Sequence, residues 1–336
     1  MSDDYLRLPQ KEQALILRSL STNKNIKREA LLLEKDIWVC WALEHLFKMP
    51  NQLPMVFKGG TSLSKAFNVI ERFSEDVDIT IDYQAFNCED PFMDGISKTK
   101  LAKISLELRS NVKQYIKDDL IPYYKTIISE QFEGNALVVE LDDDGETLHL
   151  RYPSVIEQRN GYILDSIRLE FGGRNLTVPN NVHTITSDIS EHIKNVTFPV
   201  AQVHVLSPQK TFWEKLTLIH YECNRKILKS DANRISRHWY DIVMLANHDI
   251  GKRAIANRDL LKEVVKIKKT FYDSSYANYE ACLKGNFRLI PNEAYLKLLK
   301  TDFDMMLRNK MFYGEQPDFE KIINEISKLE IQINNQ

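Results

Sequence analysis

The sequence predicts an α+β protein in which a mixed α/β lobe is followed by an α-helical lobe. Short segments with alternating apolar and polar residues, typical of strands, occur among helical patterns up to residue 206. From residue 207 onward the apolar residues keep a helical spacing. No linker rich in Pro, Gly or Ser lies between the two parts, so we expect domains at 1–206 and 207–336 that share an extensive interface.

The composition is that of an ordinary globular protein. The 336 residues are 43% hydrophobic and 27% charged, and the net charge is −2, so contact with nucleic acid requires local basic patches. The four cysteines form no Cys-x-x-Cys pair, which argues against a zinc site and fits a reducing compartment. The N-terminus has no signal-peptide pattern, and no apolar run approaches ~20 residues. We therefore expect a cytoplasmic protein without a membrane segment.

Two helices are expected at residues 8–47, with a break near residues 21–25. The second helix, at residues 27–47, carries an apolar stripe that suits packing against a sheet. Within it the charged triplet Glu34-Lys35-Asp36 is expected to form an ordinary solvated face, and a functional role is the alternative.

The chain is organised around residues 57–81. A short strand (Met55–Lys58) leads into a Gly59-Gly60-Thr61-Ser62 turn, a helix of two to three turns, and a second strand that starts near Ser74. The helix is expected to place Leu63, Phe67 and Ile70 on one face.

The second strand carries Asp76 and Asp78 on one face, because residues i and i+2 of a strand point the same way. Two such carboxylates suit a hard cation such as Mg²⁺, which usually keeps phosphate oxygens as further ligands. The two glycines allow close backbone approach, and Thr61 or Ser62 could cap the helix or donate a hydroxyl to a phosphate. Each part alone also fits a bland structure, namely a solvent-facing edge strand or a plain turn.

Further strands are expected at residues 136–141, 147–152, 162–172 and 200–206, after a loop at 87–99 and a long helix at 100–128. The acidic tip at 142–146 fits a solvated hairpin turn better than a calcium loop. On the 162–172 strand Ser166, Arg168 and Glu170 share the polar face. Glu170 could be ion-paired with Arg168 or Arg174 on an exposed sheet.

The helical part begins at Ser207-Pro208, which are typical N-cap and N1 residues. In this helix Phe212, Trp213, Leu216 and Ile219 form a core stripe, and Thr211, Lys215 and Glu222 lie on another face. A later helix begins near Arg237 and carries His238 and Asp241 on one side. Lysines interleaved with aromatics at residues 252–279 suit either RNA binding or a helical bundle with its lysines outside.

Four motifs occur in order: KGGTSLSK, RFSEDVDI, LSPQKTFWEKLTLIH and SRHWYDIVML. With this order the chain, from about Glu34 to Phe312, resembles the AbiEii/AbiGii toxin family, which includes the MenT toxins. That family is part of the nucleotidyltransferase superfamily related to DNA polymerase beta. The resemblance implies a polymerase-beta-like nucleotidyltransferase lobe followed by a helical lobe, with the active site in the cleft between them.

The resemblance also implies a set of site residues. Asp76 and Asp78 would hold Mg²⁺, with Mn²⁺ as the alternative, and Glu170 would be the third carboxylate. Lys215 would neutralise phosphate charge, and Asp241 would orient Lys215 or a substrate hydroxyl. The nucleoside triphosphate would bind Lys58, Gly59, Gly60, Thr61, Ser62, Arg72 and Lys215.

The expected reaction moves a nucleoside monophosphate to an acceptor hydroxyl. Family resemblance implies a bacterial toxin of a toxin–antitoxin or phage-defence system that modifies the 3′ end of transfer RNA and is held in check by an antitoxin protein. Two alternatives remain open from the residues. The acceptor could be a protein or a small molecule such as an aminoglycoside, or the chain could be an inactive nucleotide-binding module.

Overall fold

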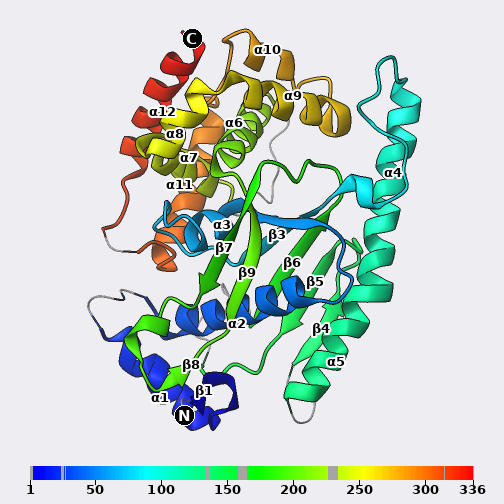
Figure 1. The fold of residues 1–336 in the computed structure, drawn as a ribbon. Coiled ribbons are helices and arrows are strands. Elements are labelled where there is room, and N and C mark those ends of the chain that lie inside the picture. The colour runs from blue at the N-terminus through cyan, green and yellow to red at the C-terminus, as the bar shows by residue number, and fades with distance from the viewer. Residues whose placement is uncertain are drawn as a thin grey trace. The chain divides into compact units, whose positions relative to one another are not determined.

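The computed structural model describes residues 3–23, 26, 28–132, 137–157, 165–225, 234–313 and 315–335 (Figure 1). The chain forms two compact units. Unit 1 comprises Met1–Ala66, Phe73–Cys88 and Leu106–Val205, and unit 2 comprises Phe67–Arg72, Glu89–Ser105 and Leu206–Gln336. Helices and a many-stranded sheet together confirm the predicted α+β class. Among the described residues, no helix combines the length and apolar character needed to cross a membrane.

Unit 1 is built on a seven-stranded mixed sheet in the order β4-β5-β6-β3-β2-β9-β7. Its strands are β2 (Met55–Lys58), β3 (Asp76–Ile81), β4 (Val138–Leu141), β5 (Thr147–Arg151), β6 (Ser166–Gly172), β7 (Asn180–Thr186) and β9 (Val200–Leu206). The central strand β3 is antiparallel to β2 and parallel to β6. β1 (Asp3–Asp4) and β8 (Val196–Thr197) form a separate pair.

The sequence predicted most of this sheet, including the β4–β5 hairpin and its acidic turn. The predicted strand at 162–172 is observed from Ser166, and residues 158–164 lie outside the described part of the chain. β7 was not predicted. Its sequence NNVHTIT is mostly polar, and it occupies the edge of the sheet, where little apolar surface is needed.

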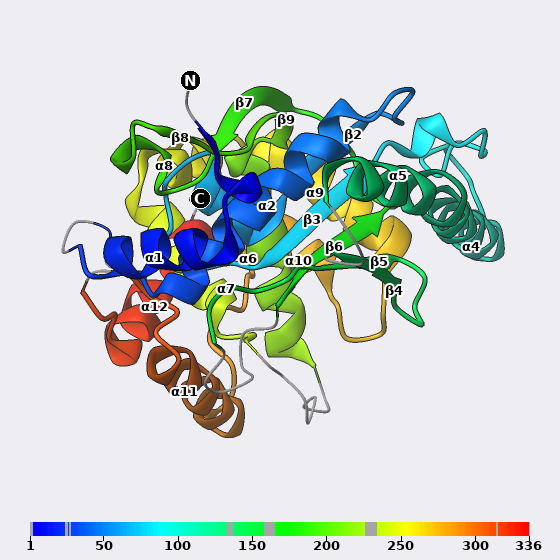
Figure 2. The ribbon, with the colours of Figure 1, turned by 90° about the horizontal axis from the view of Figure 1, so that it is seen from below.

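Helix α2 (Ala30–Lys48) is the main helix of unit 1, and Figure 1 shows it (blue) running across the strands of the sheet. It also packs against α1 (Gln10–Ser21), its neighbour in Figure 2, and Leu17 of α1 shares a buried cluster with Leu33 and Ile37 of α2. Because it contacts both the sheet and α1, α2 is buried almost all round. Its charged triplet Glu34-Lys35-Asp36 is buried as well, so the expected solvated face is wrong.

The long helix expected at residues 100–128 is observed with nearly the same limits. The long predicted helix is a continuous run of α4 (Lys98–Tyr115), the π-helical turn η3 (Ile116–Leu120) and α5 (Ile121–Gln131). Short 3-10 turns are η1 (Tyr5–Arg7), η2 (Tyr83–Ala85) and η4 (Ser190–His192).

The helix after β2 is shorter than predicted and begins earlier. α3 spans Gly59–Lys65, so the four residues expected to form a turn are helical. The helix cannot run on to Ile70 because Asn68 adopts a left-handed conformation with φ 51°. The helix makes about two turns, but its expected extension over Phe67 and Ile70 is wrong.

Unit 2 is helical, as the sequence predicted. Its helices are α6 (Pro208–Asn224), α7 (Arg237–Asn247), α8 (Asp249–Ala256), α9 (Arg258–Tyr272), α10 (Tyr279–Leu283), α11 (Glu293–Arg308) and α12 (Phe319–Asn334). The predicted core stripe of α6 is buried, but so are Thr211, Lys215 and Glu222 on its other face. Ser207 is the N-cap residue of α6, yet its side chain does not cap the helix. The basic stretch at residues 223–237 is expected to connect two helices, and its residues 226–233 lie outside the described part of the chain.

Candidate active site

The two predicted metal carboxylates lie on one face of β3. Val77, Ile79 and Ile81 alternate with them and are buried on the other face. Asp76 is itself only 7% exposed, and Asp78 is half-buried, because β3 is a central strand between β2 and β6. The bland alternative, a solvent-facing acidic edge strand, is therefore wrong.

A row of charged side chains crosses three neighbouring strands at Asp78. Lys58 of β2 is opposite Asp78, and Asp78 is in register with Glu170 of β6. Residues in register on adjacent strands point to the same face, about 5 Å apart. The structure thus brings the predicted third carboxylate to the strand position beside Asp78.

Arg168 adds a positive charge to this carboxylate face. One guanidinium nitrogen lies 3.8 Å from an oxygen of Asp76, and another lies 3.0 Å from an oxygen of Glu170. The sequence indicated only the pairing with Glu170, because the register that brings Arg168 opposite Asp76 depends on how β6 pairs with β3. Arg168 therefore neutralises charge between the two carboxylates.

The backbone of Gly59 lies directly against the carboxylate of Asp78. A Cβ atom placed on Gly59 would lie 1.9 Å from Oδ2 of Asp78, and Gly59 has a φ of 77°, which glycine adopts without strain. The glycine at the start of α3 thus allows Asp78 to pack directly against the backbone.

The hydroxyl groups of α3 have partners within the protein. Thr61 donates from Oγ1 to the backbone carbonyl of Asp76 at 2.5 Å, and Ser62 donates from Oγ to the carbonyl of Gly59 at 2.9 Å. Lys58 occupies the N-cap position, and no side chain caps the helix. The expected capping role is therefore wrong, and Thr61 instead ties α3 to the carboxylate strand.

Unit 2 holds a second charged cluster, formed by Lys215 of α6, Asp241 of α7 and Arg72. Arg72 donates to both carboxylate oxygens of Asp241, at 2.6 and 2.7 Å. The ammonium of Lys215 lies 2.9 Å from Oδ2 of the same carboxylate. His238 Nδ1 is 3.4 Å from Lys215 Nζ. Asp241 is predicted to orient either Lys215 or a substrate hydroxyl. Its carboxylate is fully buried and contacts Lys215, which favours the first role.

Burial and charge act in opposite directions on the titration of this cluster. Burial alone would raise the pKa of Asp241, but the attraction of Arg72 and Lys215 outweighs it and holds that pKa well below its usual value. Burial lowers the pKa of Lys215, and the Asp241 carboxylate opposes that change. Burial, together with the charge of Lys215, also lowers the pKa of His238, so its imidazole is neutral at pH 7.

The predicted site residues thus fall into two sets. Lys58, Gly59, Gly60, Thr61, Ser62, Asp76, Asp78 and Glu170 belong to unit 1, whereas Arg72, Lys215 and Asp241 belong to unit 2. Among the described residues, no group of three or more His, Cys, Asp or Glu side chains is arranged to hold a metal ion. The donor set Asp76 and Asp78 nevertheless fits Mg²⁺, which is commonly bound by one or two carboxylates together with substrate phosphates.

A central strand with paired carboxylates, preceded by a strand, a Gly-Gly segment and a helix, is the arrangement of a nucleotidyltransferase. The chain belongs to the AbiEii family, whose model is described as a nucleotidyl transferase AbiEii toxin of a type IV toxin–antitoxin system and matches residues 41–325. The protein is therefore a nucleotidyltransferase of this toxin family.

Solved structures of similar fold include MenT4, a nucleotidyltransferase toxin from Mycobacterium tuberculosis, and JHP933 from Helicobacter pylori. MenT4 is 16% identical with a TM-score of 0.42, covering 96% of this chain and 99% of its own. JHP933 is 15% identical with a TM-score of 0.40, covering 96% of this chain and 93% of its own. No curated protein matches the chain.

Proposed function

We propose that this protein transfers a nucleoside monophosphate from a nucleoside triphosphate to the 3′ end of transfer RNA. The observation that carries the proposal is the row formed by Lys58, Asp78 and Glu170, with Asp76 on the same face of β3. Such a row combines metal-binding oxygens, an acceptor for a proton and a cation for phosphate on adjacent strands.

In this reaction Asp76 and Asp78 hold Mg²⁺, or Mn²⁺ in its place. When bound, the metal supplies Lewis-acid stabilisation of the charge that develops on the phosphate oxygens. Asp78 is kept in place by its packing against Gly59, and Asp76 is kept in place by the bond from Thr61 to its carbonyl. The backbone of Asp76 and the carboxylate of Asp78 are thus held before substrate arrives, which favours catalysis.

The acceptor hydroxyl oxygen attacks the α-phosphorus of the nucleotide. The bond from that phosphorus to the oxygen bridging to the β-phosphorus breaks, and pyrophosphate leaves. Glu170, whose carboxylate lies 3.0 Å from a guanidinium nitrogen of Arg168, takes the proton of the attacking hydroxyl. We assign the triphosphate to Lys58 and the segment from Gly59 to Ser62.

The cluster of unit 2 serves the same reaction by resemblance to the family. Lys215 neutralises charge on the phosphates, Asp241 orients it, and Arg72 supports the same carboxylate. We infer that the reaction takes place in the cytoplasm, where transfer RNA and nucleoside triphosphates occur.

Transfer RNA is proposed as the acceptor because the family consists of toxins, and a blocked acceptor end would stop translation. An antitoxin protein and a role in phage defence belong to the same proposal. The type IV toxin–antitoxin description of the family supports the antitoxin. The negative net charge means that RNA would be bound through local patches, such as the exposed lysines of α9.

The test incubates the purified protein with each labelled nucleoside triphosphate, Mg²⁺ and total bacterial RNA, and resolves the RNA on a gel. We expect label on RNA of transfer-RNA size, and its loss in Asp76→Ala and Asp78→Ala variants. Label on added protein or aminoglycoside, with none on RNA, would mean that this molecule, and not transfer RNA, is the acceptor. No pyrophosphate release with any acceptor would identify an inactive module and overturn the proposed reaction.

A further inference from the structure

Three consecutive charged residues, Glu34, Lys35 and Asp36, are buried in the otherwise apolar helix α2. Their exposed fractions are 2%, 1% and 5%. Successive residues of a helix point about 100° apart, so the three side chains reach three different segments of unit 1. We propose that Lys35 and Asp36 are positioning residues of the active site that fix the carboxylate strand and helix α3 relative to each other. The inference rests on the proposed metal-dependent transfer.

Lys35 connects α2 to the start of the carboxylate strand. Its ammonium lies 2.5 Å from Oε2 of Glu75, and the two side chains are 2% and 10% exposed. Glu75 directly precedes Asp76, the first of the two predicted metal ligands. Because the two residues are joined by one peptide bond, a displacement of Glu75 would also move Asp76.

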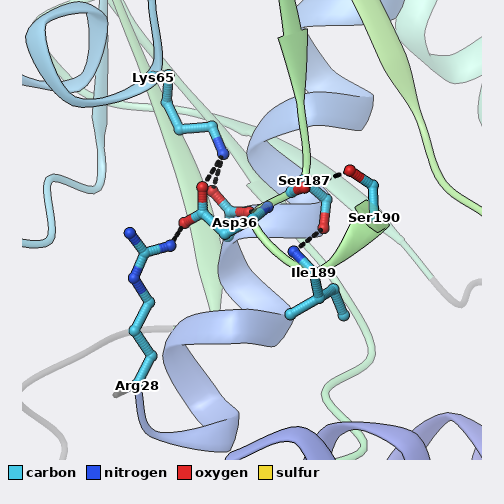
Figure 3. A network of polar contacts seen from close by, with 7 residues as sticks. Arg28, Asp36, Lys65, Ser187, Ile189 and Ser190 are labelled. Carbon is cyan, nitrogen blue, oxygen red and sulfur yellow. Dashed lines mark hydrogen bonds and ion pairs between the residues drawn. The ribbon is translucent and has the colours of Figure 1, made fainter. Parts of the chain in front are cut away.

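Asp36 connects the same turn of α2 to the end of α3. Its carboxylate lies 2.5 Å from the ammonium of Lys65, and both side chains are 6% exposed. Lys65 also lies 2.8 Å from Asp188, and Asp188 donates its backbone N–H to Asp36 at 2.7 Å. Figure 3 shows the Lys65 ammonium pointing at Asp36, with the Arg28 guanidinium, an ion-pair partner of Asp188, on the opposite side.

These two connections reach both halves of the proposed site. α3 begins at Gly59, which packs against Asp78, and ends at Lys65, which Asp36 holds. β3 begins at Asp76, beside the residue that Lys35 holds. One turn of α2 is therefore linked to the strand that carries the carboxylates and to the helix on which Asp78 rests.

Stability alone is a weak reason to bury these charges. Removing charges from water costs several kcal/mol per ion, and a buried ion pair can often be replaced by apolar residues without loss of stability. Apolar side chains, however, would not fix direction as a charged pair does. Groups that orient metal ligands typically change metal affinity by about 10–100-fold when they are lost.

Glu34 supplies an internal control on the same helix turn. Its carboxylate accepts from Ser154 Oγ and from the Val155 N–H, both at 2.6 Å, so it holds a loop that carries none of the proposed site residues. It is as deeply buried as its neighbours. Substitution of Glu34 therefore disturbs the same helix without touching β3 or α3.

The test measures Mn²⁺ binding by electron paramagnetic resonance on the full chain, together with urea unfolding, so that no activity assay is needed. The main variant is the double substitution Lys35→Met with Glu75→Gln. It removes the pair without leaving a buried charge alone, and should fold. We expect its Mn²⁺ dissociation constant to rise about 10–100-fold. Glu34→Gln should bind Mn²⁺ as the wild type does.

Asp36→Asn together with Lys65→Met tests the second connection in the same way, with the same expected rise. Equal Mn²⁺ affinity in both double variants, Glu34→Gln and the wild type would overturn the inference while leaving the proposed function intact, provided that Asp76→Ala abolishes binding. Mn²⁺ binding that is absent from the wild type, or unaffected by Asp76→Ala, would overturn the metal site of the proposed function and this inference with it.

Discussion

The buried charges of the two units differ in how they are balanced. In unit 1, Asp36 and Asp188 face Lys65 and Arg28, so two carboxylates meet two cations. In unit 2, the carboxylate of Asp241 contacts both Arg72 and Lys215. The side chains of Asp36, Lys65, Arg72, Lys215 and Asp241 are buried, whereas those of Arg28 and Asp188 are partly exposed. Both networks join segments that are distant in the sequence.

This difference suggests different tasks. A balanced network is complete without a ligand, which suits a role in holding α2, α3 and β3 together. The Asp241 carboxylate, by contrast, holds two cations beside each other, and an anionic substrate would attract the Lys215 ammonium. The lowered pKa of Lys215, caused first by burial, shows that its charge is costly in the absence of such a substrate. The comparison therefore predicts that unit 2 responds to charge changes more strongly than unit 1.

The largest effect is expected for Asp241→Asn. The substitution leaves Arg72 and Lys215 buried next to each other without their carboxylate, and breaking a buried pair costs about 3–5 kcal/mol. Urea unfolding should show a midpoint lowered accordingly. Asp249→Asn, at an exposed carboxylate paired with Lys252, should leave the midpoint nearly unchanged. Similar midpoints for the two variants would mean that the buried contacts of Asp241 contribute no more to stability than an exposed ion pair does.

Lys215→Met separates stability from activity in the same cluster. Arg72 keeps both of its bonds to Asp241, and the buried ammonium is gone, so stability should change by no more than about 1 kcal/mol. Nucleotide transfer should fall by about 10²–10³-fold, because a charge aimed at the phosphates is lost. Lys300→Met, at an exposed lysine of α11 paired with Glu320, is the control and should retain full activity. Retained transfer in Lys215→Met would remove Lys215 from the site.

The pH dependence of the stability of Glu34→Gln tests the ionisation of a buried carboxyl group in unit 1. Burial is the main cause that raises the pKa of Glu34 to about 7, while the bonds from Ser154 and Val155 lower it. The folded state therefore holds a proton that the unfolded chain releases near pH 4.5, so this carboxyl lowers stability as pH rises from 4.5 to 7. The stability of the variant relative to the wild type should rise over that window by at most about 3 kcal/mol. A difference independent of pH in urea titrations would rule out this ionisation.

The fold was predictable where the residue pattern is strong. The limits of β2 and the start of α7 were predicted, and β3 begins within two residues of its expected start, because apolar alternation and helical spacing are local signals. The end of α3 was not predictable, since the left-handed conformation of Asn68 leaves no clear trace in the residues around it. The edge strand β7 is mostly polar, so its pairing in the sheet decides its structure.

The residue types of the candidate site were predictable, but their partners were not. Arg72 and Asp241 are separated by 169 positions, and only the fold brings them together. The burial of the Glu34-Lys35-Asp36 triplet had a usable signal. Helix α2 is apolar on every side, and charges in such a helix must be buried and paired.

Gly59→Ala tests the support of Asp78 without changing any charge. Alanine at this φ of 77° is strained by about 1–2 kcal/mol, and its Cβ would meet the Asp78 carboxylate at 1.9 Å. Gly95→Ala is matched in backbone strain, with a φ of 75°, but its Cβ would meet nothing within 4 Å. Gly59→Ala should lose more stability than Gly95→Ala because its Cβ must also displace the Asp78 carboxylate, and only Gly59→Ala should lose nucleotide transfer, by about 10-fold or more. Equal losses of transfer would mean that backbone strain, rather than the position of the carboxylate, limits the reaction.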